Sequence, residues 1–241
     1  SAGLPTPPLP VRLRQLAADE IALGAPVLGQ AARFTLAGNA SGQEDGSLAA
    51  GLELRRLDGA EAKLLAELKF DPGGDQLTAR VNASEAPGGL ISSLLDLPDL
   101  PRTELRLDGS GPLSDWKGDF ALSLGSLANA EAGIAIGRPS ADAFVFKVDG
   151  HGELNPSGDD PAWDLLRGRT DIALAGTWQT AGRLQMHQLA ARGPVLALES
   201  QGTFEPESRG LDLTLKASAP DAMPLAGLLD FDRLQSLAAE I

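Results

Sequence analysis

Residues 64–84 read LLAELKFDPGGDQLTARVNAS, and this stretch decides the fold class. Apolar residues stand at every second position over 64–70, and the same alternation resumes over 77–83, after Pro-Gly-Gly at 72–74. Successive side chains of a strand point to opposite faces of a sheet, so this period gives each strand one apolar and one polar face. The glycines and the proline between the two segments favour a tight turn. The stretch therefore predicts a β-hairpin with one apolar face.

The same unit recurs later in the chain. Residues 70–100 match residues 204–234 without a gap, at an offset of 204 − 70 = 134. Upstream, residues 34–38 resemble 172–176 at an offset of 172 − 34 = 138, so the first copy carries 138 − 134 = 4 extra residues. We expect this surplus in the polar stretch 38–46, which reads as a hairpin loop. The repeat contains scaffold residues and no reactive side chain, which favours a long surface over an active site.

The alternation also occurs at 105–107, 120–124, 144–148 and 211–215, with turn signals between these segments, among them Gly-Ser-Gly-Pro at 109–112. This spacing is typical of an antiparallel all-β chain. An apolar sheet face has to be covered in one of three ways. The sheet packs on a second sheet, closes into a barrel, or curls into a trough whose occupant completes the burial.

Three segments lack this alternation and are predicted to be short helices: Gly89–Leu97, a segment from Asp160 to Gly168, and Pro224–Ile241. Each has an apolar stripe, so we expect them to cover one end of a sheet. Their polar faces lack the Lys and Arg that membrane-surface helices favour.

Composition argues against several functions. The formal charge is 20 − 33 = −13, so the chain repels phosphate backbones and we expect no nucleic-acid partner. Aromatic residues make up 4 % and Tyr is absent, which is poor for glycan or base stacking. The chain has no Cys, which excludes disulfides and thiolate sites.

Two groups of polar residues have spacings that occur in catalytic or metal sites. Ser114 and Lys117 have Ser-x-x-Lys spacing, but the other motifs of such acyl-transfer enzymes are absent, which favours a polar hairpin. Asp149, His151 and Glu153 share one strand face, yet ligands at this spacing on a straight strand rarely converge on a metal. We therefore predict no enzyme activity, no catalytic residue, no metal and no cofactor.

Four segments are similar to the N-terminal half of the TamB family, the inner-membrane-anchored subunit of the translocation and assembly module within the AsmA-like group. They are Leu9–Leu16, Ile21–Gly29, Glu85–Leu90 with the leucines after it, and Leu107–Trp116. The resemblance covers about residues 5–125 and is thinner beyond.

This resemblance implies a fold, a place and a function. Family members are anchored in the inner membrane by one N-terminal helix and cross the periplasm as a β-taco with an apolar interior. They meet the outer-membrane subunit TamA at the C-terminal end, and are implicated in phospholipid movement and outer-membrane protein assembly. For this chain it implies a periplasmic fragment of a longer protein, which meets TamA through regions absent here.

The fold expectation is all-β with a few short helices, an elongated β-taco or β-groove built from stacked strand repeats. We expect one domain over 1–241, with repeat-like halves at about 34–100 and 172–234 joined by 101–171. The expected partners are phospholipid acyl chains and outer-membrane protein strands. The alternative is an interaction scaffold or spacer that binds protein strands by β-augmentation without carrying lipid.

The residues expected to line the lipid groove are the larger apolar residues of the alternating segments: Phe34, Leu36, Leu68, Phe70, Leu77, Val81, Leu105, Leu107, Phe120, Leu122, Phe144, Phe146, Leu211, Leu213 and Leu215. A closed, fully packed core made by the same residues is the other reading of this pattern.

Overall fold

The computed structural model describes residues 11–25, 30–94, 100–156, 167–180, 182–206, 210–219 and 237–240. The chain divides into two compact units, Ser1–Ser126 (unit 1) and Leu127–Ile241 (unit 2). Each unit is described by itself.

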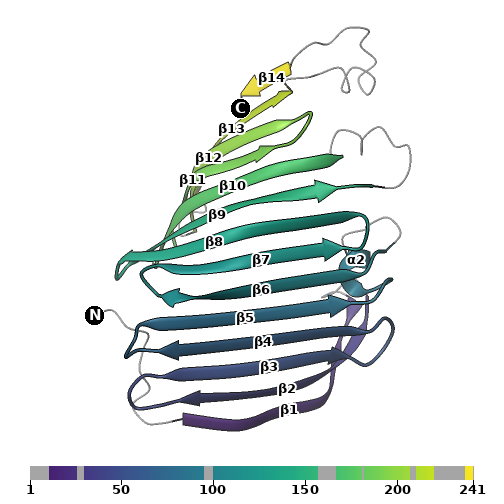
Figure 1. Ribbon diagram of the computed structural model, residues 1–241, viewed down its shortest axis with the longest axis vertical. Helices are drawn as coiled ribbons and strands as arrows, with labels where there is room; N and C mark the ends of the chain where they lie inside the picture. The colour runs from purple at the N-terminus through teal and green to yellow at the C-terminus, as the bar shows by residue number, and fades with distance from the viewer. Residues whose placement is uncertain are drawn as a thin grey trace. The chain divides into compact units, whose positions relative to one another are not determined.

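Unit 1 is a β-meander. Its elements are β1 (Val11–Leu23), β2 (Ala32–Gly42), β3 (Leu48–Arg56), β4 (Ala62–Asp71), β5 (Gln76–Glu85), α2 (Leu90–Leu94), β6 (Thr103–Pro112) and β7 (Trp116–Leu124). Each strand pairs with the next one in the chain, always antiparallel. Figure 1 shows these strands side by side in chain order.

Unit 2 has the same architecture. Its strands are β8 (Ala128–Ser140), β9 (Ala143–Leu154), β10 (Gly168–Gln179), β11 (Leu184–Arg192), β12 (Ala197–Glu205), β13 (Gly210–Ala219) and β14 (Leu237–Glu240). They too pair antiparallel in chain order. The described residues are therefore mostly strand, joined by turns and loops, with very little helix, which confirms the all-β, antiparallel prediction.

The repeat found in the sequence is kept in the strand register. Phe70 pairs with Leu77, and Phe204 pairs with Leu211, at the same offset of 134. The last residue of β5, Glu85, pairs with Thr103, and 134 residues later Ala219 pairs with Leu237. Strand β14 thus occupies the position of β6, and the repeat continues one strand beyond residue 234.

The upstream alignment needs a correction. Leu48 pairs with Phe70 and with Gly42, whereas Leu184 pairs with Phe204 and with Trp178. The ladder therefore matches Gly42 to Trp178, an offset of 178 − 42 = 136 rather than 138. The predicted surplus in 38–46 was wrong, because the loops after β2 and β10 match in length and the difference lies downstream. A shift of two residues in the alignment keeps every side chain on the same face of the sheet. The apolar alternation therefore cannot distinguish an offset of 138 from one of 136.

The helix predictions had mixed outcomes. Helix α2, Leu90–Leu94, falls within the first predicted helix. The second lies mostly outside the described residues, and its predicted end, Gly168, begins β10. The third is wrong at its end, because Leu237–Glu240 is strand β14, paired with Lys216–Ala219. The remainder of that segment, 220–236, lies outside the described residues.

The turn predicted at 109–112 was also wrong. These residues belong to β6, and the reversal follows Pro112, where the amide of Asp115 donates to the carbonyl of Pro112 at 2.9 Å. Gly109 serves packing instead, since a Cβ on it would lie 2.0 Å from the ring of Trp116.

Candidate functional site

One face of the unit 1 sheet is apolar from edge to edge. Residues paired across neighbouring strands point to the same face, so the register defines rows of side chains that cross the sheet. The first row is Ala18, Leu36, Leu54, Leu64, Ala83, Leu105 and Leu122. The second is Leu16, Gly38, Leu52, Ala66, Val81, Leu107 and Phe120. The third is Leu13, Ala40, Ala50, Leu68, Ala79, Gly109 and Gly118. We call these rows the unit 1 apolar face.

Large apolar side chains on this face remain accessible to solvent. Leu68 is 44 % exposed, and Leu13, Leu16 and Leu52 are also exposed. Within the described part of unit 1, strands contact their sheet neighbours and no second sheet layer packs over the rows. Contiguous exposed apolar surface of this kind marks an interaction site in proteins that remain in solution.

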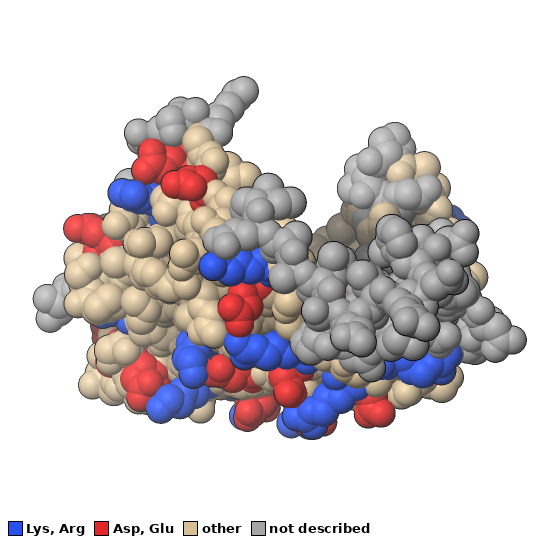
Figure 2. Space-filling model, turned by 90° about the horizontal axis from the view of Figure 1, so that it is seen from above, with Lys and Arg blue, Asp and Glu red and all other residues tan. Residues whose placement is uncertain are grey.

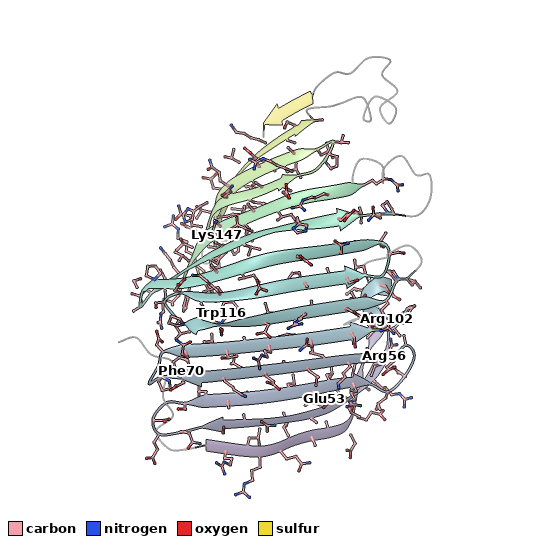
Figure 3. The ribbon with its side chains drawn as sticks, in the orientation of Figure 1. Glu53, Arg56, Phe70, Arg102, Trp116 and Lys147 are labelled. Carbon is pink, nitrogen blue, oxygen red and sulfur yellow. The ribbon has the colours of Figure 1, made fainter. Side chains whose placement is uncertain are left out.

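Buried groups bound the rows at both strand ends. Phe70 and Trp116 are buried at one end, while Arg56, Glu85 and Thr103 are buried at the other. Figure 3 shows Phe70 and Trp116 at the end of the sheet opposite to Arg56. The exposed leucines therefore lie between two closed ends, one aromatic and one polar.

At the polar end the charges are held by the protein itself. The Glu85 carboxylate accepts hydrogen bonds from the amides of Leu90, at 2.5 Å, and Ile91, at 2.8 Å, at the start of α2. Asp58 accepts from the amide of Arg33 at 3.2 Å and from Nε of Arg56 at 3.1 Å. The hydrogen bond from the Arg33 amide, followed by that from Arg56, lowers the pKa of Asp58 below its ordinary value.

Unit 2 also has an apolar face, defined in the same way. Its inner rows are Ile134, Val148, Leu174, Leu189, Ser200 and Leu215, and Ile136, Phe146, Gly176, Met186, Gly202 and Leu213. Its end row is Phe144, Trp178, Leu184, Phe204 and Leu211. No residue of these rows is charged, and in the end row Leu211 is 67 % exposed.

The opposite faces of both sheets are polar. Exposed ion pairs join neighbouring residues there, for example Arg80 with Asp108 at 3.3 Å and Arg169 with Asp171 at 3.0 Å. Figure 2 shows basic and acidic side chains intermixed rather than separated by sign. A depression of about 300 Å³ in unit 1 includes Asn39 and Glu53, but its lining brings together no reactive set of groups.

The structure places twelve of the fifteen predicted groove residues in the rows of the two apolar faces, seven in unit 1 and five in unit 2. The other three, Phe34, Phe70 and Leu77, lie on the same side of the unit 1 sheet but beyond its three rows, and Phe34 pairs with Arg56. Phe34 and Phe70 are buried, Leu68, Leu211 and Leu213 are exposed, and the others are half-buried. The sequence analysis missed exposed members of the same rows, namely Leu13, Leu16, Leu52, Trp178, Leu184, Leu189 and Phe204. Their signal was the same period of two.

In the Ser114–Lys117 segment and on the strand of Asp149, exposed ion pairs hold two of the charged groups. Nζ of Lys117 lies 3.1 Å from Oδ2 of Asp115 and its side chain is exposed. Asp149 pairs with Lys147 at 2.6 Å. Among the described residues, no three His, Cys, Asp or Glu side chains are grouped to hold a metal ion. The described helical residues include no stretch that is both long and apolar enough to span a bilayer.

Comparison with known proteins returned no matching family model, no matching curated protein and no matching solved structure. The TamB assignment stays a prediction.

Proposed function

We propose that this chain is a periplasmic segment of a TamB-like envelope protein, and that its apolar faces carry phospholipid acyl chains between the inner and outer membranes in support of outer-membrane biogenesis. One observation carries the proposal. Rows of Leu, Ala, Val, Gly and Phe cross the unit 1 sheet without a charged residue, and their larger members are exposed or half-buried rather than buried.

The energetics suit such cargo. Each methylene removed from water contributes about 0.8 kcal/mol, so a 16-carbon chain favours an apolar surface by roughly 12 kcal/mol. A row that crosses β1–β7 spans about 29 Å at the usual strand spacing. One bilayer leaflet is about 15 Å deep in hydrocarbon, so an acyl chain fits within a row. Movement along a row, from one strand to the next, exchanges like contacts for like, which keeps the barrier to sliding low.

We infer further that the sheets curl into a β-groove around this cargo. Strand β1 has register shifts between Leu13 and Leu16 and between Ala18 and Ile21. Such bulges bend a strand and increase its twist, which supports a curled sheet.

Photo-crosslinking in cells tests the proposal. A photoreactive residue at Val81 or Leu213, on the apolar faces, should capture phospholipid. The same residue at the adjacent Asn82 or Thr214, on the polar faces, should capture far less. Equal capture from both faces, or none from Val81 and Leu213, contradicts a lipid conduit.

The second candidate is a scaffold that receives protein strands at a sheet edge. Native mass spectrometry of the purified chain separates the two candidates. Co-purifying phospholipid supports the conduit, whereas a lipid-free protein that still binds unfolded barrel strands supports the scaffold.

A further inference from the structure

An arginine lies at one boundary of the unit 2 apolar face. The end row of this face contains Phe144, and Cζ of Arg138 lies over its ring, 5.1 Å from the ring centroid. This distance is that of a cation–π interaction. The inner rows beside Phe144 carry no charged residue. The guanidinium therefore places a positive charge where the apolar surface ends.

A β-bulge brings Arg138 to this position. The pairing of β8 with β9 shifts register between Gly137 and Ser140. Arg138 and Pro139 of β8 therefore stand opposite a single residue of β9, Phe144. Such a bulge re-aims a side chain away from the regular alternation of its strand, and bulges are frequent next to functional sites. The register thus explains why a charged side chain lies against this row.

Two further contacts fix the surroundings of the guanidinium. Nη2 of Arg138 donates to the carbonyl of Ala141 at 2.8 Å, which ties it to the turn after β8. On its other side the Phe144 ring neighbours that of Trp178, with ring centroids 6.4 Å apart and an interplanar angle of 36°. Tryptophan is enriched where hydrocarbon meets polar head groups, because its ring is apolar and its N–H is polar.

The apolar surface beside this cluster has the depth of a lipid tail. From Phe146 to Gly150, β9 extends about 14 Å at the usual rise per residue. The hydrocarbon of one bilayer leaflet is about 15 Å deep. A cation, an aromatic boundary and an apolar surface of this depth therefore follow one another along the strands of unit 2.

We propose that Arg138 binds the phosphate of a phospholipid whose acyl chains lie on the inner rows of unit 2. This inference rests on the lipid function proposed above and adds the place where the head group is held. A guanidinium presents N–H donors in a fixed plane that matches phosphate oxygens, and the stack on Phe144 orients that plane. Because the formal charge of the chain is −13, a phosphate needs a local cation to rest on this surface.

Two lipids that differ only in the phosphate test this assignment. Dioctanoyl phosphatidic acid and dioctanoylglycerol carry the same acyl chains. The indole N–H resonance of Trp178, followed by NMR during titration of the unsubstituted protein, reports the Kd in unit 2 separately from unit 1. Phosphatidic acid should bind at least tenfold more tightly than dioctanoylglycerol. Raising the ionic strength from about 0.05 M to 0.5 M should weaken only the phosphatidic acid.

Arg138→Gln should weaken binding of phosphatidic acid at least fivefold and change that of dioctanoylglycerol less than twofold. Arg138→Lys, which keeps the charge but loses the planar fork, should fall between this variant and the unsubstituted protein. Arg169→Gln is the matched control, because it removes an arginine that pairs with Asp171 on the polar face of the same sheet. It should leave both affinities unchanged.

The outcomes separate this site from the lipid function on which it rests. Equal affinities of the unsubstituted protein for the two lipids, or an equal loss of both in Arg138→Gln, overturn the phosphate site and leave lipid carriage standing. Glycerol 3-phosphate that binds as tightly as phosphatidic acid also overturns it, because the site then holds a free phosphate ester. If neither lipid shifts the Trp178 resonance, the inference and the lipid function of unit 2 both fail.

Discussion

A Cβ atom on Gly109 would stand 2.0 Å from Cζ2 of Trp116, because the indole ring lies directly over this glycine. Gly118, the cross-strand partner of Gly109, lies under the same ring, where a Cβ would be 2.6 Å from Cη2. Trp116 is buried as a result. The glycine pair therefore sets the height at which this ring closes one end of the unit 1 apolar face.

Alanine at Gly109 should destabilise unit 1. The added methyl group would force the buried Trp116 ring to move, and overpacking of this kind costs about 1–3 kcal/mol. The free energy of unfolding in urea measures the loss. In a Gly109→Ala, Trp116→Ala double variant the methyl group no longer meets the ring, so its separate cost should largely vanish.

Gly133→Ala is the control for this prediction. A Cβ at Gly133 meets only the carbonyl oxygen of Asp149, at 3.9 Å. The substitution should change stability by no more than about 0.5 kcal/mol. Similar losses for Gly109→Ala and Gly133→Ala would mean that strand glycine in general, rather than the indole contact, determines the cost.

The sequence predicted which residues share a face, because a period of two is a local property that every strand carries. All fifteen groove candidates lie on the same side of their sheet as the apolar rows, although the period of two does not show which strands pair. Exposure could not be predicted, since it depends on what lies above the face. Phe70 and Phe204 occupy equivalent positions of the repeat, yet Phe70 is 6 % exposed and Phe204 is 42 % exposed.

Local signals failed where one residue type serves two purposes. Gly109 reads as a turn residue, but a glycine that makes room for a ring looks the same in sequence as one that reverses the chain. Leu237–Glu240 read as the end of a helix because Leu and Ala fit either structure over a few residues. Pairing with β13 decides that segment, and it is a long-range contact.

Glu85 should contribute to stability through α2. Its carboxylate accepts hydrogen bonds from the amides of Leu90 and Ile91, and Glu85→Ala would leave both donors, at the first turn of α2, without this partner. We expect a loss of about 1–2 kcal/mol in urea unfolding, with part of it restored in Glu85→Gln. Glu104→Ala, which removes an exposed ion pair with Arg102, should cost less than about 0.5 kcal/mol. Equal effects at both glutamates would contradict the capping role.

Asp58 should make the free energy of unfolding depend on pH in the acidic range. Its pKa is lowered in the folded protein by the Arg33 amide and then by Arg56. A depressed folded pKa gives stability that is present above the unfolded pKa and is lost as pH falls through the folded pKa. Asp58→Asn should therefore be less stable than the parent at pH 7, and the gap should shrink below about pH 4. Urea midpoints measured from pH 7 to pH 2.5 check this, and a gap that stays constant or widens in acid would contradict it.

A carboxylate on the apolar face should stop lipid binding without unfolding the protein. Leu68 is 44 % exposed in the third row, so Leu68→Glu keeps its charge in water when the face is empty. A bound acyl chain would have to desolvate that charge, which costs several kcal/mol and exceeds what a few methylene contacts contribute. Co-purified phospholipid, measured by native mass spectrometry, should fall at least tenfold.

Lys69→Glu puts the same charge on the polar face of the same strand and should leave the lipid content unchanged. If Leu68→Glu retains its lipid with an unchanged circular dichroism spectrum, the cargo does not cross this row; if it loses its β-sheet spectrum, Leu68 belongs to a packed core instead.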